Sequence, residues 1–82
     1  MKSGTRVQVD PSVLLVGGLE GEACTMPKGL TGEKARMMRK LGRRRVRVWF
    51  PPSELAKKGK IFGQRDFGLS FWISRKMVTE IE

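Results

Sequence analysis

Hydrophobic and polar residues alternate along several stretches of the chain, and a period of two is typical of a half-buried β-strand. The clearest stretch is 45–50, in which Val46, Val48 and Phe50 face one way and the other three residues face the opposite way. Residues 6–9 and 67–73 alternate in the same manner. The pattern therefore predicts at least these three strands. Weaker strand candidates lie at 22–26 and 77–81. The run 13–16 is either a short strand or an ordered loop.

Proline and glycine separate these stretches. Pro11, Pro27 and Pro51 each follow a predicted strand, and proline cannot extend a strand within a sheet. Several short strands with one apolar face each bury that face best as a small barrel or sandwich. We therefore expect one all-β domain over residues 1–82, a small barrel of about five strands.

The segment 30–42 departs from the strand pattern. Thr31 is a suitable N-cap, Gly42 is a suitable stop, and Met37, Met38 and Leu41 fall on one side of a helix drawn between them. The segment is either an amphipathic helix or a mobile basic loop inserted into the barrel. A helix this short is marginal alone and needs tertiary packing. After Pro52, residues 53–57 allow one helical turn, and 61–62 are expected to begin the next strand.

Four parts of the sequence carry a family resemblance: the opening 4–9, the turn 18–22, the strand 45–50, and the closing strand, three-residue turn and strand at 71–81. They resemble segments of small SH3-like barrels. Similar patterns occur in the variable chain of ferredoxin–thioredoxin reductase, the small SH3-like subunit of photosystem I and KOW-type domains. The resemblance implies an SH3-like barrel whose closing turn is a single 3₁₀ turn. It implies no function, because small barrels serve many.

Composition narrows the chemistry. The 82 residues include no histidine, which removes the usual general base at neutral pH, Ser/His and Cys/His catalysis and a histidine metal site. We expect no enzyme activity, no metal and no cofactor. The single cysteine, Cys24, cannot form a disulfide within the chain, is expected to be a small buried apolar side chain and favours a cytoplasmic location. Residues 1–10 lack the apolar core of a signal peptide, and 13–16 is too short to span a membrane.

Positive charge is concentrated in one stretch of the chain. Residues 28–47 carry nine basic residues against Glu33, which is +8 of the net charge of +9. Such a cluster favours a polyanionic partner, and arginine binds phosphate in a bidentate manner. The leading interpretation is RNA or DNA binding, mainly through backbone phosphates; the alternative is a solvated loop that keeps the protein soluble. The expected contacts are Arg36, Arg39, Lys40, Arg43, Arg44, Arg45 and Arg47, with Lys57, Lys58 and Lys60 as a second region.

Two tryptophans lie on the polar sides of their strands. If 45–50 and 67–73 pair, Trp49 and Trp72 reach the outer surface near Arg45 and Arg47, an arrangement that holds single-stranded nucleic acid by stacking. In the alternative, the apolar side chains of 37–41 fold over both tryptophans as a second small core.

A different functional class also fits the charge. The chain is then a non-catalytic accessory subunit that docks on an acidic protein, and a homodimer through a sheet edge or the methionine-rich segment is a further option. A membrane partner is not expected, because 30–42 has no aromatic residue.

Overall fold

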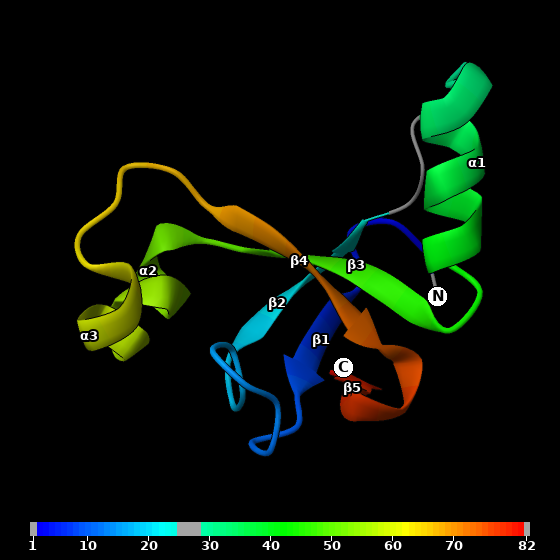
Figure 1. Cartoon of the computed structure of the whole chain (residues 1–82). Coiled ribbons are helices and arrows are strands. Elements are labelled where there is room, and N and C mark those ends of the chain that lie inside the picture. The colour runs from blue at the N-terminus through cyan, green and yellow to red at the C-terminus, as the bar shows by residue number, and fades with distance from the viewer. Residues whose placement is uncertain (1, 25–28, 82) are drawn as a thin grey trace.

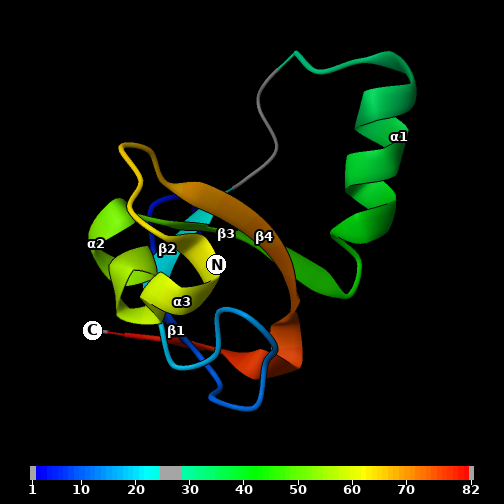
Figure 2. The ribbon, with the colours of Figure 1, turned by 60° about the vertical axis from the view of Figure 1, so that its left-hand side comes forward.

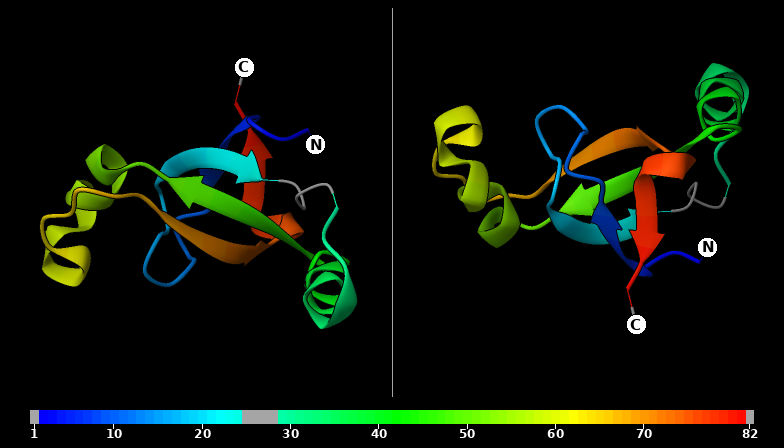
Figure 3. Two further views of the ribbon diagram at one scale, coloured as in Figure 1. Left: turned by 90° about the horizontal axis from the view of Figure 1, so that it is seen from above. Right: turned by 90° about the horizontal axis from the view of Figure 1, so that it is seen from below.

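The computed structural model of the protein describes residues 2–24 and 29–81. Within these residues, five strands form one antiparallel sheet in the order β4-β3-β2-β1-β5 (Figure 1). The strands are β1 (Arg6–Val9), β2 (Glu20–Cys24), β3 (Arg45–Phe50), β4 (Leu69–Ser74) and β5 (Val78–Glu80). The sheet is strongly twisted, so that β3 and β4 run across β1 (Figure 3).

The alternation predicted from the sequence is confirmed in β1 and β3. Val7 and Val9 are fully buried, and so are Val48 and Phe50, with Val46 nearly so. These side chains form one core on a single face of the sheet. The loop between β1 and β2 and the segment after β3 complete that core with Val16, Leu19 and Leu55, together with Ala23 and Ile73. Arg45 and Arg47 lie on the opposite face of β3.

Helices make up the rest of the regular structure. The longest, α1 (Gly32–Leu41), stands at one end of the molecule, and a compact group of short helices lies at the other end (Figures 1 and 2). That group comprises α2 (Pro52–Leu55), the 3₁₀ turn η1 (Ala56–Lys58) and α3 (Gly59–Phe62). A second 3₁₀ turn, η2 (Arg75–Met77), joins β4 to β5, which confirms the predicted closing turn.

The expectation of an all-β, SH3-like barrel is wrong. The structure is mixed α and β, with 32% of the described residues in helix and 32% in strand. The sheet is open, since β4 and β5 are its edges and no ladder joins them among the described residues. The sequence pattern misled because Ile61 and Phe62 belong to α3 rather than to a strand, and Phe62 packs on Phe71 with ring centroids 5.9 Å apart. The short helices therefore cover part of the core that a closing barrel would have covered.

Several element bounds differ from the prediction. Strand β2 begins at Glu20 instead of residue 22, and the run 13–16 is a turn-rich loop rather than a strand. Strand β4 begins at Leu69, and Phe67, assigned to its apolar face, is 80% exposed. The predicted strand residues Thr25 and Met26, the stop Pro27 and the basic residue Lys28 lie outside the described residues.

The helical interpretation of 30–42 is confirmed. Thr31 is the N-cap residue, although its side chain makes no capping hydrogen bond, and the Gly42 N–H donates to the Met38 carbonyl at 2.9 Å. Glu33 in the first turn and Arg39 and Lys40 in the last turn complement the helix dipole. Among the described residues, no helix is long and apolar enough to cross a membrane.

Candidate functional site

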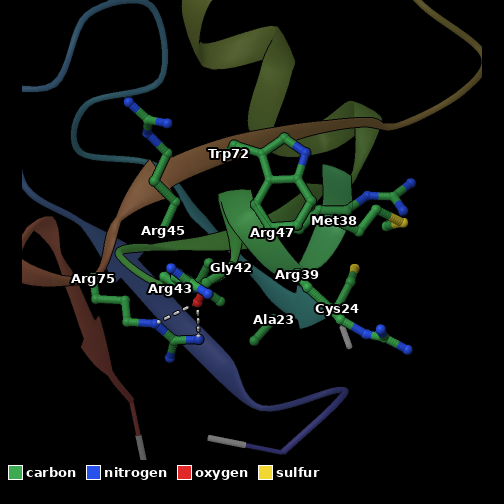
Figure 4. A pocket seen from close by; sticks show the side chains of 11 residues that line it. Ala23, Cys24, Met38, Arg39, Gly42, Arg43, Arg45, Arg47, Trp72 and Arg75 are labelled. Carbon is green, nitrogen blue, oxygen red and sulfur yellow. Dashed lines mark hydrogen bonds between the residues drawn. The ribbon is translucent and has the colours of Figure 1, made fainter. Parts of the chain in front are cut away.

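A hollow of about 310 Å³ lies between the C-terminal half of α1, the turn that follows it and the outer face of β2, β3 and β4. Side chains from all of these elements converge on it (Figure 4). None of the described residues that line it is acidic. The lining residues are Ala23, Cys24, Met38, Arg39, Gly42, Arg43, Arg45, Val46, Arg47, Trp72 and Arg75.

The strand register places the arginines of β3 beside Trp72. Arg47 is paired with Cys24 on β2 and with Trp72 on β4, so the three side chains form one row across the outer face. Arg45 is paired with Ser74 in the parallel row. Residues directly opposite each other on antiparallel strands have Cβ atoms about 5 Å apart. The predicted proximity of Trp72 to Arg45 and Arg47 is therefore confirmed.

Four arginines of the hollow have no protein partner within residues 2–24 and 29–81. The ion pairs found there are Arg6–Glu20 and Lys57–Glu54, both outside the hollow. The guanidinium groups of the four make no hydrogen bond to any described group. They are Arg39, Arg43, Arg45 and Arg47. Guanidinium groups bind carboxylates and phosphates through two parallel N–H···O bonds, so the hollow has side chains suited to such an anion.

Arg75 is a site residue that the sequence did not reveal. Its Nε and Nη2 donate to the Gly42 carbonyl oxygen at 3.3 and 2.9 Å, and its backbone N–H donates to the Arg44 carbonyl at 3.0 Å. These contacts fasten the turn after α1 to η2. Arg75 is 33 residues from Gly42, and no local pattern reports a contact at that separation.

Trp49 faces the same side of the sheet but lies in different surroundings. It lines a second hollow of about 160 Å³ with Glu20, Glu22 and Glu54. Its indole passes so close to Gly68 that a Cβ there would meet the ring at 2.5 Å. Trp49 therefore shares its hollow with three carboxylates and Arg6, and it is not among the residues that line the basic hollow.

Glu54 is the best-held carboxylate of that second hollow. It accepts a hydrogen bond from the Glu20 N–H at 3.0 Å and pairs with Lys57 Nζ at 2.8 Å. Partial burial works against the charged form, but these two hydrogen bonds and the charges of Lys57 and Arg6 hold the pKa of Glu54 below its usual value. The hydrogen bond to Glu54 likewise raises the pKa of Lys57.

The second small core expected over the tryptophans is not formed. Met38 lines the hollow beside Trp72 (Figure 4), but Met37 is 64% exposed and both tryptophans are half-buried. The buried side chain of α1 is Ala35. At its C-terminal end the helix borders the hollow, and the carbonyl of Gly42 accepts a hydrogen bond from Arg75.

The remaining predicted contacts are distributed over the molecule. Lys40 and Arg44 line an adjoining hollow with Arg43 and Arg45. Arg36 lies on another side of α1, beside Glu33. The three lysines proposed as a second region lie on η1 and α3, at the opposite end of the molecule from α1 (Figure 1); they are Lys57, Lys58 and Lys60.

Within the described residues, no group of three or more acidic or cysteine side chains is placed to hold a metal ion. Cys24 is half-buried and lines the hollow, so the expectation of a buried thiol is wrong. Its strand position, opposite Arg47 at the sheet surface, explains the exposure.

Comparisons with known proteins supply no relative. No protein-family model, no curated protein and no solved structure matches this chain.

Proposed function

We propose that the protein binds nucleic acid through backbone phosphates, and that the hollow beside α1 is the principal contact. The observation that carries the proposal is the convergence of Arg39, Arg43, Arg45 and Arg47 on one hollow without an acidic neighbour in its described lining. Like charges held together without counter-charges repel one another, and a polyanion relieves that repulsion. Arginine is also the side chain that binds phosphate best in two-point geometry.

The charges of the hollow extend beyond it along one end of the molecule. Lys40 and Arg44 continue the positive surface from the hollow to the adjoining one. A phosphate chain that leaves the hollow therefore meets further cations without crossing the carboxylates around Trp49. This arrangement supports an extended polyanion more than a single small anion.

Salt dependence tests the proposal. Neutralising about four phosphates of a single strand gives a slope of about −3 for log K against log salt concentration. Fluorescence anisotropy with a labelled oligonucleotide, over about 50 to 200 mM salt, measures that slope. Absence of binding at low salt, or affinity that stays constant as salt rises, overturns the proposal.

Matched variants locate the contact. The pair Arg43→Ala and Arg45→Ala removes two exposed charges at the hollow, and Lys58→Ala and Lys60→Ala remove two at the opposite end. The first pair is expected to make the salt slope shallower by between one and two units, and the second to leave it nearly unchanged. Equal losses from both pairs contradict a localised site. Equally tight binding of polyglutamate favours instead an acidic protein partner.

A further inference from the structure

The hollow combines its cations with one aromatic ring and several apolar groups. Trp72 is its aromatic side chain, and Met38 reaches it from α1 (Figure 4). Ala23 and Val46, which belong to the core, also border it. A surface that attracts phosphates alone needs none of these apolar groups. A nucleobase has a flat apolar face, and aromatic rings and thioethers both make favourable contacts with such faces.

The pairing of β3 with β4 sets the distance between the Trp72 ring and the arginine side chains. Trp72 and Arg47 are directly paired across β4 and β3, and Arg45 lies two residues along on the same face. A base stacked on the indole therefore has guanidinium groups within reach of the phosphates on either side of it. At about 310 Å³ the hollow is at the lower end of the range for small-ligand sites.

A base within a duplex is not available to this hollow. Its faces are covered by its neighbours in the stack, and exposing them costs a few kcal/mol. Unpaired bases present their faces freely, which is why aromatic side chains bind single strands.

We propose that the hollow takes one unpaired base, stacked on Trp72, and that the protein therefore prefers single-stranded nucleic acid to duplex. This inference rests on the proposed function, because the arginines that bind the phosphates also bring the base to the ring. Trp72 is then a binding residue, while Trp49, which lines a hollow with three carboxylates and packs over Gly68, is not.

Three matched polyanions separate stacking from charge. They are a single-stranded oligonucleotide, an abasic strand of the same length and charge, and a duplex of the same sequence. Affinity for the oligonucleotide is expected to exceed that for the abasic strand on the order of tenfold, the contribution of one stacked base. Equal affinities for all three, each with a steep salt slope, overturn the base site and leave the proposed function standing. Absence of binding to all three polyanions overturns both the base site and the proposed function.

The fluorescence of single-tryptophan variants reports on the ring itself. Trp49→Phe retains Trp72, and its emission is expected to be quenched by the oligonucleotide but not by the abasic strand. Trp72→Phe retains Trp49, and no quenching is expected. Quenching confined to Trp49 contradicts the proposal.

Cys24 provides a second readout in the unaltered protein. It is the single cysteine of the chain, and it lies in the same row as Arg47 and Trp72. Saturation with the oligonucleotide is expected to slow the alkylation of Cys24. Saturation with the abasic strand is expected to slow it less, because no base covers the thiol. Alkylation at the rate of the free protein, with the oligonucleotide bound, shows that no base occupies the hollow and overturns the inference.

Discussion

The guanidinium group of Arg75 donates two hydrogen bonds to the carbonyl oxygen of Gly42, the residue that caps the C-terminal end of α1. The last carbonyls of a helix lack partners within the helix and carry partial negative charge, so a cation is favourable there. Arg75 thus connects the turn between β4 and β5 to the segment that carries Arg43 and Arg45. It is a positioning residue for the hollow as well as one of its cations.

Replacing Arg75 by alanine is expected to cost about 1 kcal/mol of unfolding free energy, since the hydrogen bonds lost are partly exposed to solvent. Oligonucleotide affinity is expected to fall by more than the loss of one charge explains, because the turn after α1 is released. Lys76→Ala is the matched control, since Lys76 is the exposed neighbour in η2. Urea unfolding and anisotropy titration measure both effects. Indistinguishable behaviour of the two variants contradicts a positioning role.

Gly68 allows the indole of Trp49 to lie against the backbone. A Cβ at this position would collide with the Phe50 carbonyl oxygen and with the Trp49 ring. Gly68→Ala is therefore expected to destabilise the protein by about 1–3 kcal/mol, the cost of overpacking. Gly59→Ala is the control, because its Cβ meets nothing within 4 Å and its backbone is helical. That variant is expected to be more stable by about 0.4–1 kcal/mol. Thermal unfolding of both variants distinguishes these outcomes.

Glu54 makes stability depend on pH in the acid range. Its pKa is lower in the folded protein than in the unfolded chain, so the unfolded chain binds more protons as pH falls. The stabilisation is complete above the unfolded pKa and is lost as pH falls through the folded pKa. Glu54→Gln is expected to cost about 1 kcal/mol at neutral pH and to approach the parent protein at acid pH, where both side chains are neutral.

Urea unfolding at a series of pH values tests this convergence. Asp10 contributes to the same acid region, since hydrogen bonds from the Ser12 side chain and backbone lower its pKa, so the variant retains part of the acid sensitivity. Glu80→Gln, at an exposed position of β5, is the control and leaves the stability curve unchanged. A difference between Glu54→Gln and the parent that stays constant across pH contradicts the assignment.

Leu55 connects the short helices to the core. It is 0% exposed, although it belongs to a segment that is otherwise polar. Leu55→Ala is expected to cost about 2–5 kcal/mol, a large share of the stability of a domain of this size. Leu14→Ala, at a loop position that is 87% exposed, is expected to change stability by less than about 0.5 kcal/mol. Similar costs at the two positions would show that α2 is not anchored as described.

The sequence pattern predicted the elements that are determined by residues close together along the chain. The alternation in 45–50 placed Val48 inside and Arg47 outside, and the capping residues around α1 placed that helix. In the region 52–62, the helical turn expected at 53–57 is present, but 61–62 was misread as the start of a strand, because Phe62 finds its partner, Phe71, on β4. Its helices follow from tertiary packing, which sequence periodicity does not report.

The candidate site, like the fold, was predicted only in part from the sequence. The outward faces of two strands brought Arg45, Arg47 and Trp72 together as expected. Net charge, however, says nothing about position, so the sequence did not show that the second region, with Lys58 and Lys60, lies at the opposite end of the molecule from α1 (Figure 1). Arg75 was missed because it is 33 residues from Gly42 in the sequence, and only the path of the chain after β4 brings the two residues into contact.

Strand β3 carries the core on one side and the arginines on the other, which makes it tolerant of one kind of genetic change and intolerant of another. A substitution at Arg45 or Arg47 alters the surface and leaves the core intact. One inserted codon shifts the following residues by half a repeat and turns a charged side chain inward. In a library scored for folded protein, outer-face substitutions are expected to survive and insertions within 45–50 to disappear. The outer face of this strand can thus evolve by exchanging side chains, but not by changing the length of the strand.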